Sequence, residues 1–174
     1  MKRSKSGFTI IELLVVIVVI GILASTVVVA YGGVQQRALN DARLSEVKAW
    51  QKTLMLAYVD NNSGPSVPAG NYCLGSGFPS GACRDYLANN SVTYYEANNA
   101  ALMVVLKKES SLPSGPRQPI NGTVGPYVNL WAGGSGFTIT NVFSGHSSDC
   151  PSPLTYTWDD GSGRLLCQID VQYN

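Results

Sequence analysis

Hydrophobic residues form one nearly continuous run close to the start of this chain, from Phe8 to Ala30. No proline occurs between Phe8 and about Asp60, so a single long helix can form there. At ~1.5 Å per residue this helix would reach about 80 Å. The run is apolar almost all round and approaches the ~20 residues that span the hydrocarbon of a bilayer. The pattern therefore predicts a transmembrane helix over residues 8–31.

The pattern becomes amphipathic after Gly32 and Gly33, where apolar residues recur at spacings of three and four. This spacing gathers them on one helix face. The predicted stripe consists of Val47, Trp50, Leu54, Ala57 and Tyr58. The polar face carries Gln35, Arg37, Arg43, Glu46 and Lys48. We expect residues 32–60 to continue the helix, with the stripe docked on a globular domain and the polar face toward water or neighbouring subunits.

The rest of the chain changes character twice. Residues 61–90 are rich in Gly, Pro, Ser and Asn, which predicts a long loop. Residues 91–174 then read as a globular domain. Within it, 96–110 suits a short helix that ends at Leu112-Pro113, and a buried strand over 102–106 is the alternative.

The last third of the chain has the signature of two β-hairpins, in which strand-like segments flank glycine-rich turns. The first hairpin joins 127–131 to 137–143, and the second joins 154–158 to 165–171. The predicted fold class is therefore α+β: a long N-terminal helix packed on a C-terminal antiparallel β-sheet.

Four cysteines follow the hydrophobic run, at Cys73, Cys83, Cys150 and Cys167. An even number in an exported domain predicts disulfides, and four cysteines allow three connectivities. Pairing of sequence neighbours is favoured because it closes two short loops. It would make 61–90 a disulfide-clipped loop. The spacings do not suit a Cys-x2-Cys zinc site, and we expect no metal centre.

Positive charge precedes the hydrophobic run, at Lys2, Arg3 and Lys5. Such a head stays on the cytoplasmic side while the following residues enter the bilayer. Glu12 interrupts the run, although a charge at mid-span costs roughly 2.5 to 3.5 kcal/mol on insertion scales and less near an end. An ordinary secretory signal has a shorter apolar core and a small-residue cleavage site, and does not predict this glutamate.

The junction Gly7-Phe8-Thr9-Ile10-Ile11-Glu12-Leu13-Leu14 resembles the processing site of type IV prepilins and the related pseudopilins. The resemblance implies that 1–7 is a leader peptide, that a prepilin peptidase cuts after Gly7, and that Phe8 becomes the N-methylated first residue. Glu12 is then the fifth residue of the mature chain. The short leader, the phenylalanine, Gly21 and the Ala30-Tyr31 pair are similar to type IVa pilins.

Cleavage would create an amine on Phe8 one helical turn before Glu12, and residues at i and i+4 share a helix face. The resemblance implies that Glu12 takes the amine of a neighbouring subunit and so sets the register of assembly. Two simpler accounts of Glu12 remain open. A carboxylate is favoured near a helix N-terminus by the helix dipole, and near a membrane edge it can reach the headgroups.

Three glycines, Gly21, Gly32 and Gly33, weaken the predicted helix by about 1 kcal/mol each relative to alanine. They suit either close packing between helices or, as the resemblance implies, a segment that unwinds in the filament. The proline that type IVa pilins commonly carry before the Ala-Tyr pair is replaced by Val29, so we expect less kinking.

The resemblance implies a structural subunit of a type IV pilus, stored in the cytoplasmic membrane and polymerised through its N-terminal helix into an extracellular filament. Adhesion, twitching motility and DNA uptake are the activities of such filaments. The implied partners are further copies of the chain, the prepilin peptidase, an assembly ATPase and its platform protein. The alternatives are a type II secretion pseudopilin and a membrane-anchored binding protein that does not polymerise.

Composition argues against catalysis and against nucleic-acid binding. The single histidine, His146, lies in a loop-like stretch, so we expect no enzyme and no cofactor. Asp159 and Asp160 suit a solvated turn better than a calcium site, which needs six to eight oxygen ligands. Removing the leader takes away three of twelve basic residues against eleven acidic ones, which leaves a balance of −2. That is no nucleic-acid footprint.

Overall fold

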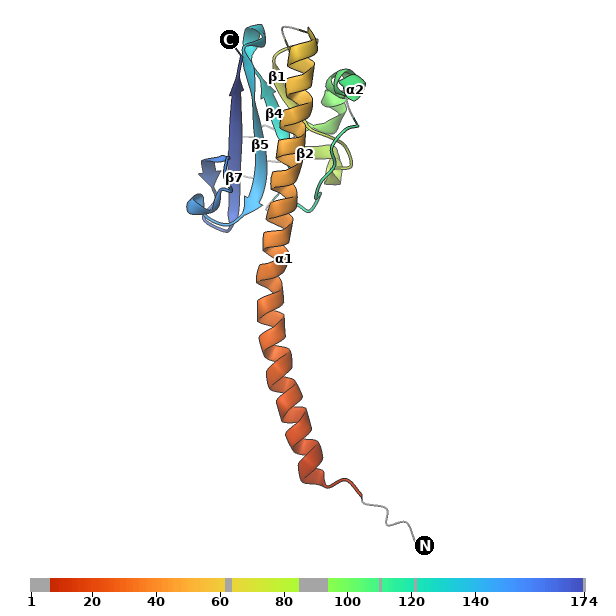
Figure 1. Ribbon diagram of the computed structural model, residues 1–174, viewed down its shortest axis with the longest axis vertical. Coiled ribbons are helices and arrows are strands. Elements are labelled where there is room, and N and C mark those ends of the chain that lie inside the picture. Colours follow the sequence, from red (N-terminus) through yellow and green to blue (C-terminus); the bar gives the residue numbers. More distant parts are fainter. Residues whose placement is uncertain (1–6, 62–63, 85–93, 110, 121, 174) are drawn as a thin grey trace. The chain divides into compact units, whose positions relative to one another are not determined.

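The computed structural model describes residues 7–61, 64–84, 94–109, 111–120 and 122–173. The chain divides into two compact units, Met1–Ala38 and Leu39–Asn174. Helix α1, Ile10–Asn61, supplies residues to both units (Figure 1). It agrees with the helix predicted from the absence of proline.

In the first unit the large apolar side chains that the structure describes on α1 are exposed, from 86% for Ile10 down to 47% for Val16. The helix is continuous through Gly21, Gly32 and Gly33. Among the described residues, no helix has an apolar stretch long enough to cross a membrane.

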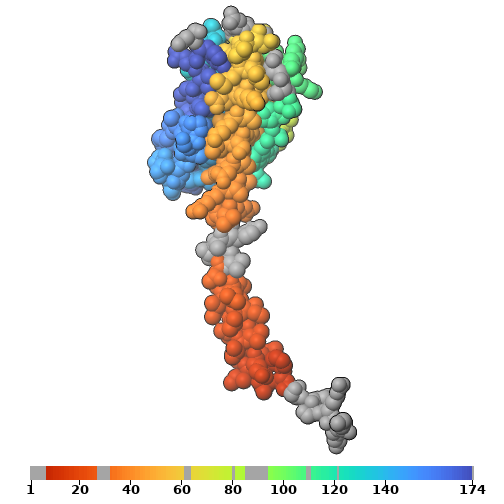
Figure 2. Space-filling view, viewed as in Figure 1, coloured from red at the N-terminus to blue at the C-terminus, as the bar shows by residue number. Residues whose placement is uncertain are grey.

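In the second unit, the amphipathic part of α1 supplies one side of the hydrophobic core. The five residues of the predicted stripe are all buried, and Trp50 and Leu54 are completely inaccessible. The Tyr58 hydroxyl donates a hydrogen bond to the carbonyl oxygen of Gly136 at 2.8 Å. Figure 2 shows the other side of this part of α1 at the surface, between the C-terminal strands and the segments coloured green. This part of α1 is therefore partly buried and partly exposed.

The main sheet contains five strands that pair antiparallel in the order β1-β4-β5-β7-β6. They are β1 Gly70–Cys73, β4 Tyr127–Leu130, β5 Gly136–Ser144, β6 Thr155–Asp159 and β7 Arg164–Gln172. The two predicted hairpins are β4–β5 and β6–β7, and β5 and β7 pair along their whole length. The α+β fold predicted from the sequence is therefore the observed one.

One face of the sheet packs against α1, as the alternation along the strands requires. Phe137, Ile139 and Phe143 of β5 and Leu165 of β7 are fully buried in the same cluster as the α1 stripe. Helix α2, Ala100–Glu109, adds Leu102 and Leu106 to this cluster. The helix predicted here is confirmed, and the alternative of a strand over 102–106 is wrong.

Residues 61–90 are not simply a long loop, which corrects the sequence prediction. They contain β1, the short 3-10 helix η1, Pro79–Gly81, and β2, Ala82–Arg84. Strand β1 is an edge strand that pairs with β4 from Gly70↔Leu130 to Cys73↔Tyr127. Its sequence has little strand propensity, so pairing with β4 decides its conformation. Residues 62–63 and 85–90 of this stretch lie outside the described residues.

Smaller elements complete the second unit. Strand β2 pairs with β3, Tyr94–Tyr95, in a separate two-stranded sheet. The 3-10 helix η2, Glu96–Asn99, leads into α2, and η3, Ala132–Gly134, and η4, Ser147–Asp149, lie in connections of the main sheet.

Truncation of the α1 stripe should destabilise the second unit. Leu54→Ala removes a fully buried side chain, and we expect the free energy of unfolding to fall by about 2 to 5 kcal/mol. Met55→Ala, one residue further along α1, is the control, because Met55 is 41% exposed. Urea unfolding followed by circular dichroism measures both variants. Equal losses in the two variants would show that the stripe is not what stabilises the unit.

Candidate functional site

The residues of the N-terminal motif lie at the start of α1. Gly7, Phe8 and Thr9 precede the helix, and the Phe8 side chain is 81% exposed. The Glu12 carboxylate accepts hydrogen bonds from the backbone N–H of Thr9 at 2.8 Å and from its hydroxyl at 2.7 Å. The Glu12 N–H in turn donates to the Thr9 hydroxyl at 3.3 Å. This is a capping box, in which two otherwise unpaired backbone N–H groups at a helix start are satisfied.

The capping box gives Glu12 a role within a single chain. It supports the account in which this carboxylate stabilises the helix N-terminus, and it leaves the predicted contact with a neighbour's amine as a prediction. Thr9 is a functional residue that our sequence reasoning missed. Its signal was present, because Thr-x-x-Glu before an apolar run is the sequence pattern of a capping box.

The three helix glycines lie in open surroundings. Among the described residues, a Cβ atom added to Gly21, Gly32 or Gly33 would have no neighbour within 4 Å. No contact with the described part of the chain therefore requires glycine at these positions. The unwinding predicted for the filament concerns an assembled state and stays a prediction.

Two disulfides join the cysteines as sequence neighbours. Cys73 is bonded to Cys83, with their Cα atoms 5.6 Å apart, and Cys150 to Cys167, with their Cα atoms 5.8 Å apart. This is the pairing that the short loops favoured. The first bond ties the end of β1 to β2, and the second ties the connection before β6 to β7. Each bond therefore restrains an outer part of the main sheet.

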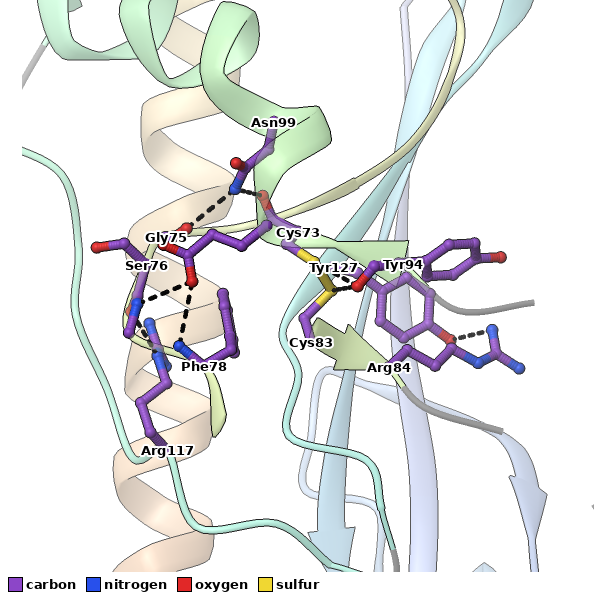
Figure 3. The surroundings of a disulfide bond; sticks show 12 residues. Cys73, Gly75, Ser76, Phe78, Cys83, Arg84, Tyr94, Asn99, Arg117 and Tyr127 are labelled. Atoms are coloured by element: carbon purple, nitrogen blue, oxygen red, sulfur yellow. Dashed lines mark hydrogen bonds between the residues drawn. A yellow bond between two sulfur atoms is a disulfide. The ribbon is translucent and has the colours of Figure 1, made fainter. Parts of the chain in front are cut away.

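The surroundings of Cys73–Cys83 are well ordered by hydrogen bonds (Figure 3). Buried Asn99 donates through Nδ2 to the carbonyl oxygens of Cys73 and Gly75 at 2.8 and 2.9 Å. The Glu96 carboxylate accepts from the backbone N–H groups of Gly77 and Phe78 at 3.1 and 3.3 Å. The 3-10 helix η2, which contains Glu96 and Asn99, thus fixes the segment between β1 and β2.

Two residues of the predicted polar face of α1 are buried, which corrects the sequence interpretation. Arg43 is 1% exposed and Glu46 is 3% exposed, whereas Gln35, Arg37 and Lys48 are exposed as predicted. Arg43 Nη2 donates to the carbonyl oxygen of Gln118 at 2.8 Å, and Arg117 Nη1 forms an ion pair with Glu46 Oε1 at 2.8 Å. The charges are buried because residues 115–118 pass over this part of α1.

The helical spacing itself could have identified these two residues. Arg43 lies four residues before Val47, and Glu46 lies four residues before Trp50, so both extend the buried stripe toward the N-terminus. The sequence interpretation placed Arg43 and Glu46 on the polar face because both side chains are charged. Charged residues are rarely buried without a partner, and Arg117, the partner of Glu46, lies 71 positions away in the sequence.

Burial changes the protonation behaviour of this pair. Removal from water raises the pKa of the Glu46 carboxyl group, although Arg117 and Arg43 act in the opposite direction. Burial likewise lowers the pKa of Arg43, although Glu46 acts in the opposite direction. Among the described residues, Nε and Nη1 of Arg43 have no hydrogen-bond partner. Gly115 contacts the Glu46 carboxylate so closely that a Cβ atom would collide with it. This cluster holds the 115–118 segment on α1.

The remaining candidate residues, His146, Asp159 and Asp160, lie in or next to connections between strands. His146 is exposed. Asp159 accepts from the backbone N–H of Gly161, and Asp160 accepts from those of Ser162 and Arg164, all at 2.8 to 3.0 Å. In the part of the chain that the structure describes, no three His, Cys, Asp or Glu side chains gather in a way that could hold a metal ion.

Comparison with known proteins finds relatives of the N-terminal part of the chain. Residues 2–28 match the family described as the prokaryotic N-terminal methylation motif. The type II secretion system core protein G of Aeromonas hydrophila is 41% identical over 69 residues, which are 40% of this chain and 48% of that protein. Core protein G of Dickeya chrysanthemi is 36% identical over 70 residues, 40% of this chain and 46% of that protein.

The same core protein of Escherichia coli K12 is 38% identical over 67 residues, which are 38% of this chain and 46% of that protein. The chain therefore spans about half the length of the curated relatives it matches. No solved structure matches the chain significantly. The motif, the similarity of the N-terminal part to these relatives and the α+β fold support the resemblance to the pilin and pseudopilin superfamily.

Glu46 should make stability depend on pH. Because its pKa is raised in the folded state, its contribution is fully present below the ordinary value of about 4.3 and is lost as the pH rises through the raised pKa. We expect the free energy of unfolding of the native protein to fall, relative to that of Glu46→Gln, as the pH rises across this window. Urea unfolding at a series of pH values measures the difference.

The control for this experiment is Ser45→Ala, which changes an exposed residue of the same helix and no ionisable group. Its difference from the native protein should stay nearly constant across the series. If the native protein keeps a constant stability difference from Glu46→Gln, or gains stability relative to it as the pH rises, the pKa of Glu46 is not raised by folding.

Proposed function

We propose that this chain is a structural subunit of a pseudopilus of the type II secretion kind. It is made as a prepilin, cut after Gly7 by a prepilin peptidase, methylated on Phe8 and polymerised through its N-terminal helix. The N-terminal methylation motif over residues 2–28 carries the proposal, and the relatives named as type II secretion core protein G support it. Its work is mechanical and not enzymatic.

The driving force of assembly in this proposal is the apolar surface of the first unit. Exposed side chains such as Ile10, Ile11 and Leu13 each expose 60% or more of their surface in the single chain. Burial of apolar surface yields roughly 25 cal/mol per Å². Residues 8–31 bury this surface first in the cytoplasmic membrane and then against the same segments of neighbouring copies.

The proposed assembly contact joins the Glu12 carboxylate of one subunit to the Phe8 amine of the next. In the single chain this carboxylate is held by Thr9, so the contact has to replace or share the capping hydrogen bonds. The capping hydrogen bonds and the proposed contact both end on a charged carboxylate. The amine differs in carrying a full positive charge, and the attraction between opposite charges is stronger in a water-poor filament core than in water. Gly21, Gly32 and Gly33 then permit close packing or local unwinding of the helices.

The partners in this proposal are further copies of the chain, the prepilin peptidase, an assembly ATPase and its platform protein. The second candidate is a subunit of a type IV pilus that extends from the cell surface for adhesion, twitching motility or DNA uptake. Both disulfides lie in the globular part of the chain, beyond the N-terminal methylation motif, so the motif match itself does not decide between the two assemblies. A membrane-anchored binding protein that does not polymerise is the third.

Replacement of Gly7 tests the processing step. We expect Gly7→Ala to retain its leader, because the proposed cut follows this glycine directly. Gly21→Ala is the matched control, since it changes a glycine of the same segment outside the cleavage site. Intact mass spectrometry of membrane fractions reads the outcome: native protein and control lose residues 1–7 and gain one methyl group. Fully processed Gly7→Ala protein means that the cut lies elsewhere.

Replacement of Glu12 tests the assembly contact. We expect Glu12→Ala to be processed normally but to give at least tenfold fewer filaments, because the amine of the neighbouring subunit loses its acceptor. Thr9→Ala is the decisive control, since it removes the two hydrogen bonds made by the Thr9 hydroxyl and keeps the carboxylate. Filament yield by electron microscopy should be close to native for Thr9→Ala. If the two variants lose filaments equally, Glu12 acts as a helix cap and not as the assembly contact.

Shearing of cells separates the three candidates. Short structures that stay in the envelope support the pseudopilus, and long released fibres support the pilus. Processed protein that stays monomeric in the membrane indicates the anchored binding protein and overturns both filament proposals.

A further inference from the structure

The face of the main sheet that points away from α1 carries a patch of polar side chains. We call it the amide face and define it by Asn71, Asn129, Trp131, Thr138, Gln168 and Asp170. The strand register places four of these residues side by side, in the row Asn71↔Asn129↔Thr138↔Asp170 across β1, β4, β5 and β7. Gln168 lies two residues before Asp170 on the same side of β7. All six side chains are exposed or half-buried.

Hydrogen bonds between these side chains hold the amide face in place. Asn129 Nδ2 donates to Asn71 Oδ1 at 2.9 Å. The Thr138 hydroxyl donates to Asp170 Oδ1 at 2.7 Å and accepts from Trp131 Nε1 at 3.1 Å. Gln168 Nε2 donates to Asp170 Oδ2 at 3.1 Å, and Thr157 of β6 donates to Gln168 Oε1 at 3.1 Å. A ligand that binds here meets side chains already ordered, which lowers the entropic cost of binding.

The same network leaves hydrogen-bonding groups directed at solvent. Within the described residues, Asn71 Nδ2 and Asn129 Oδ1 have no protein partner, so a donor and an acceptor stand next to each other on adjacent strands. The Asp170 carboxylate also keeps acceptor capacity beyond its bonds to Thr138 and Gln168. A pair of neighbouring hydroxyl groups matches this arrangement, because each hydroxyl both donates and accepts.

Trp131 gives one end of the amide face an aromatic surface. A Cβ atom on Gly136 would lie 2.8 and 2.9 Å from two carbons of the indole ring, so the ring lies against the backbone of β5. The indole is half-buried in this position. The face of an aromatic ring carries partial negative charge and attracts weakly positive C–H groups, such as those on the flat side of a sugar ring.

The charge of the amide face limits the kinds of ligand that can bind there. Asp170 is the only charged residue of the amide face, whereas the exposed side of α1 carries Lys48 and Lys52. No cation of the amide face could hold a phosphate or sulfate group, and Asp170 repels acidic polymers. The patch is not apolar either, so an apolar protein surface would leave its amide groups unpaired.

We propose that the amide face binds an uncharged polysaccharide, with Asn71, Asn129 and Asp170 bonded to sugar hydroxyls and Trp131 against a sugar ring. The second unit supplies all these residues, so the site is independent of cleavage at Gly7 and of polymerisation. A filament would present many copies of the site, and its total binding strength would exceed that of one subunit.

Titration of the full-length chain in detergent micelles with neutral hexasaccharides tests this proposal. The probes are cellohexaose, laminarihexaose and maltohexaose, with hexagalacturonate as the acidic counterpart, and isothermal titration calorimetry is the readout. We expect at least one neutral hexasaccharide to bind and the acidic one to bind more weakly. Asn129→Ala should weaken binding by about fivefold or more, as expected for the loss of one or two hydrogen bonds.

The matched control is Asn98→Ala, which truncates an exposed asparagine outside the amide face and should leave the affinity unchanged. Trp131→Ala should abolish binding, and circular dichroism checks its fold because Trp131 also packs on Gly136. Three results would each overturn the proposal: no binding of any neutral probe, equal affinity of Asn129→Ala and the native chain, or tighter binding of hexagalacturonate.

Discussion

The packing of the amphipathic part of α1 against the main sheet is the contact on which the second unit depends. Trp50, Leu54 and Tyr58 share one core with strands β5 and β7, and α2 adds to the same core. This contact also explains why Arg43 and Glu46 are buried, since residues 115–118 can cross the helix only where it is held against the sheet. Removing one partner of a buried ion pair costs about 3 to 5 kcal/mol, so the crossing segment and the helix are strongly coupled.

The two disulfides differ in their relation to this core. Cys167 belongs to the core cluster and Cys150 packs against it, whereas Cys73 and Cys83 are buried in a separate cluster. Cys73–Cys83 restrains β1, an edge strand of four residues, and Cys150–Cys167 restrains the region next to β6, the other edge. Short edge strands gain the least from sheet pairing, and a covalent link reduces the conformational freedom that they would have in the unfolded chain. At the centre of the sheet β5 and β7 pair over nine residues each, and no disulfide joins these two strands to each other.

Much of this fold could be predicted from the sequence, because long elements have strong periodic patterns. The helix, both hairpins and the α1 stripe followed directly from spacing, and neighbour pairing of the cysteines followed from loop length. Strand β1 escaped prediction because its conformation depends on β4, which is distant in the sequence. Burial of Glu46 escaped for the same reason, since Arg117 is also distant. The Thr9 cap could be predicted from the local Thr-x-x-Glu pattern, but Glu12 was interpreted only through its charge.

If the chain assembles as proposed, the Thr9–Glu12 capping box also affects when a stored subunit joins the filament. The Glu12 carboxylate already accepts two hydrogen bonds from its own chain, so the amine of another subunit must compete with them. Stray encounters between stored subunits then gain little, whereas an encounter that also aligns the apolar helices gains enough to open the cap. The Thr9–Glu12 hydrogen bonds would thus favour incorporation of correctly aligned subunits over random contacts. They would form again whenever a subunit is released.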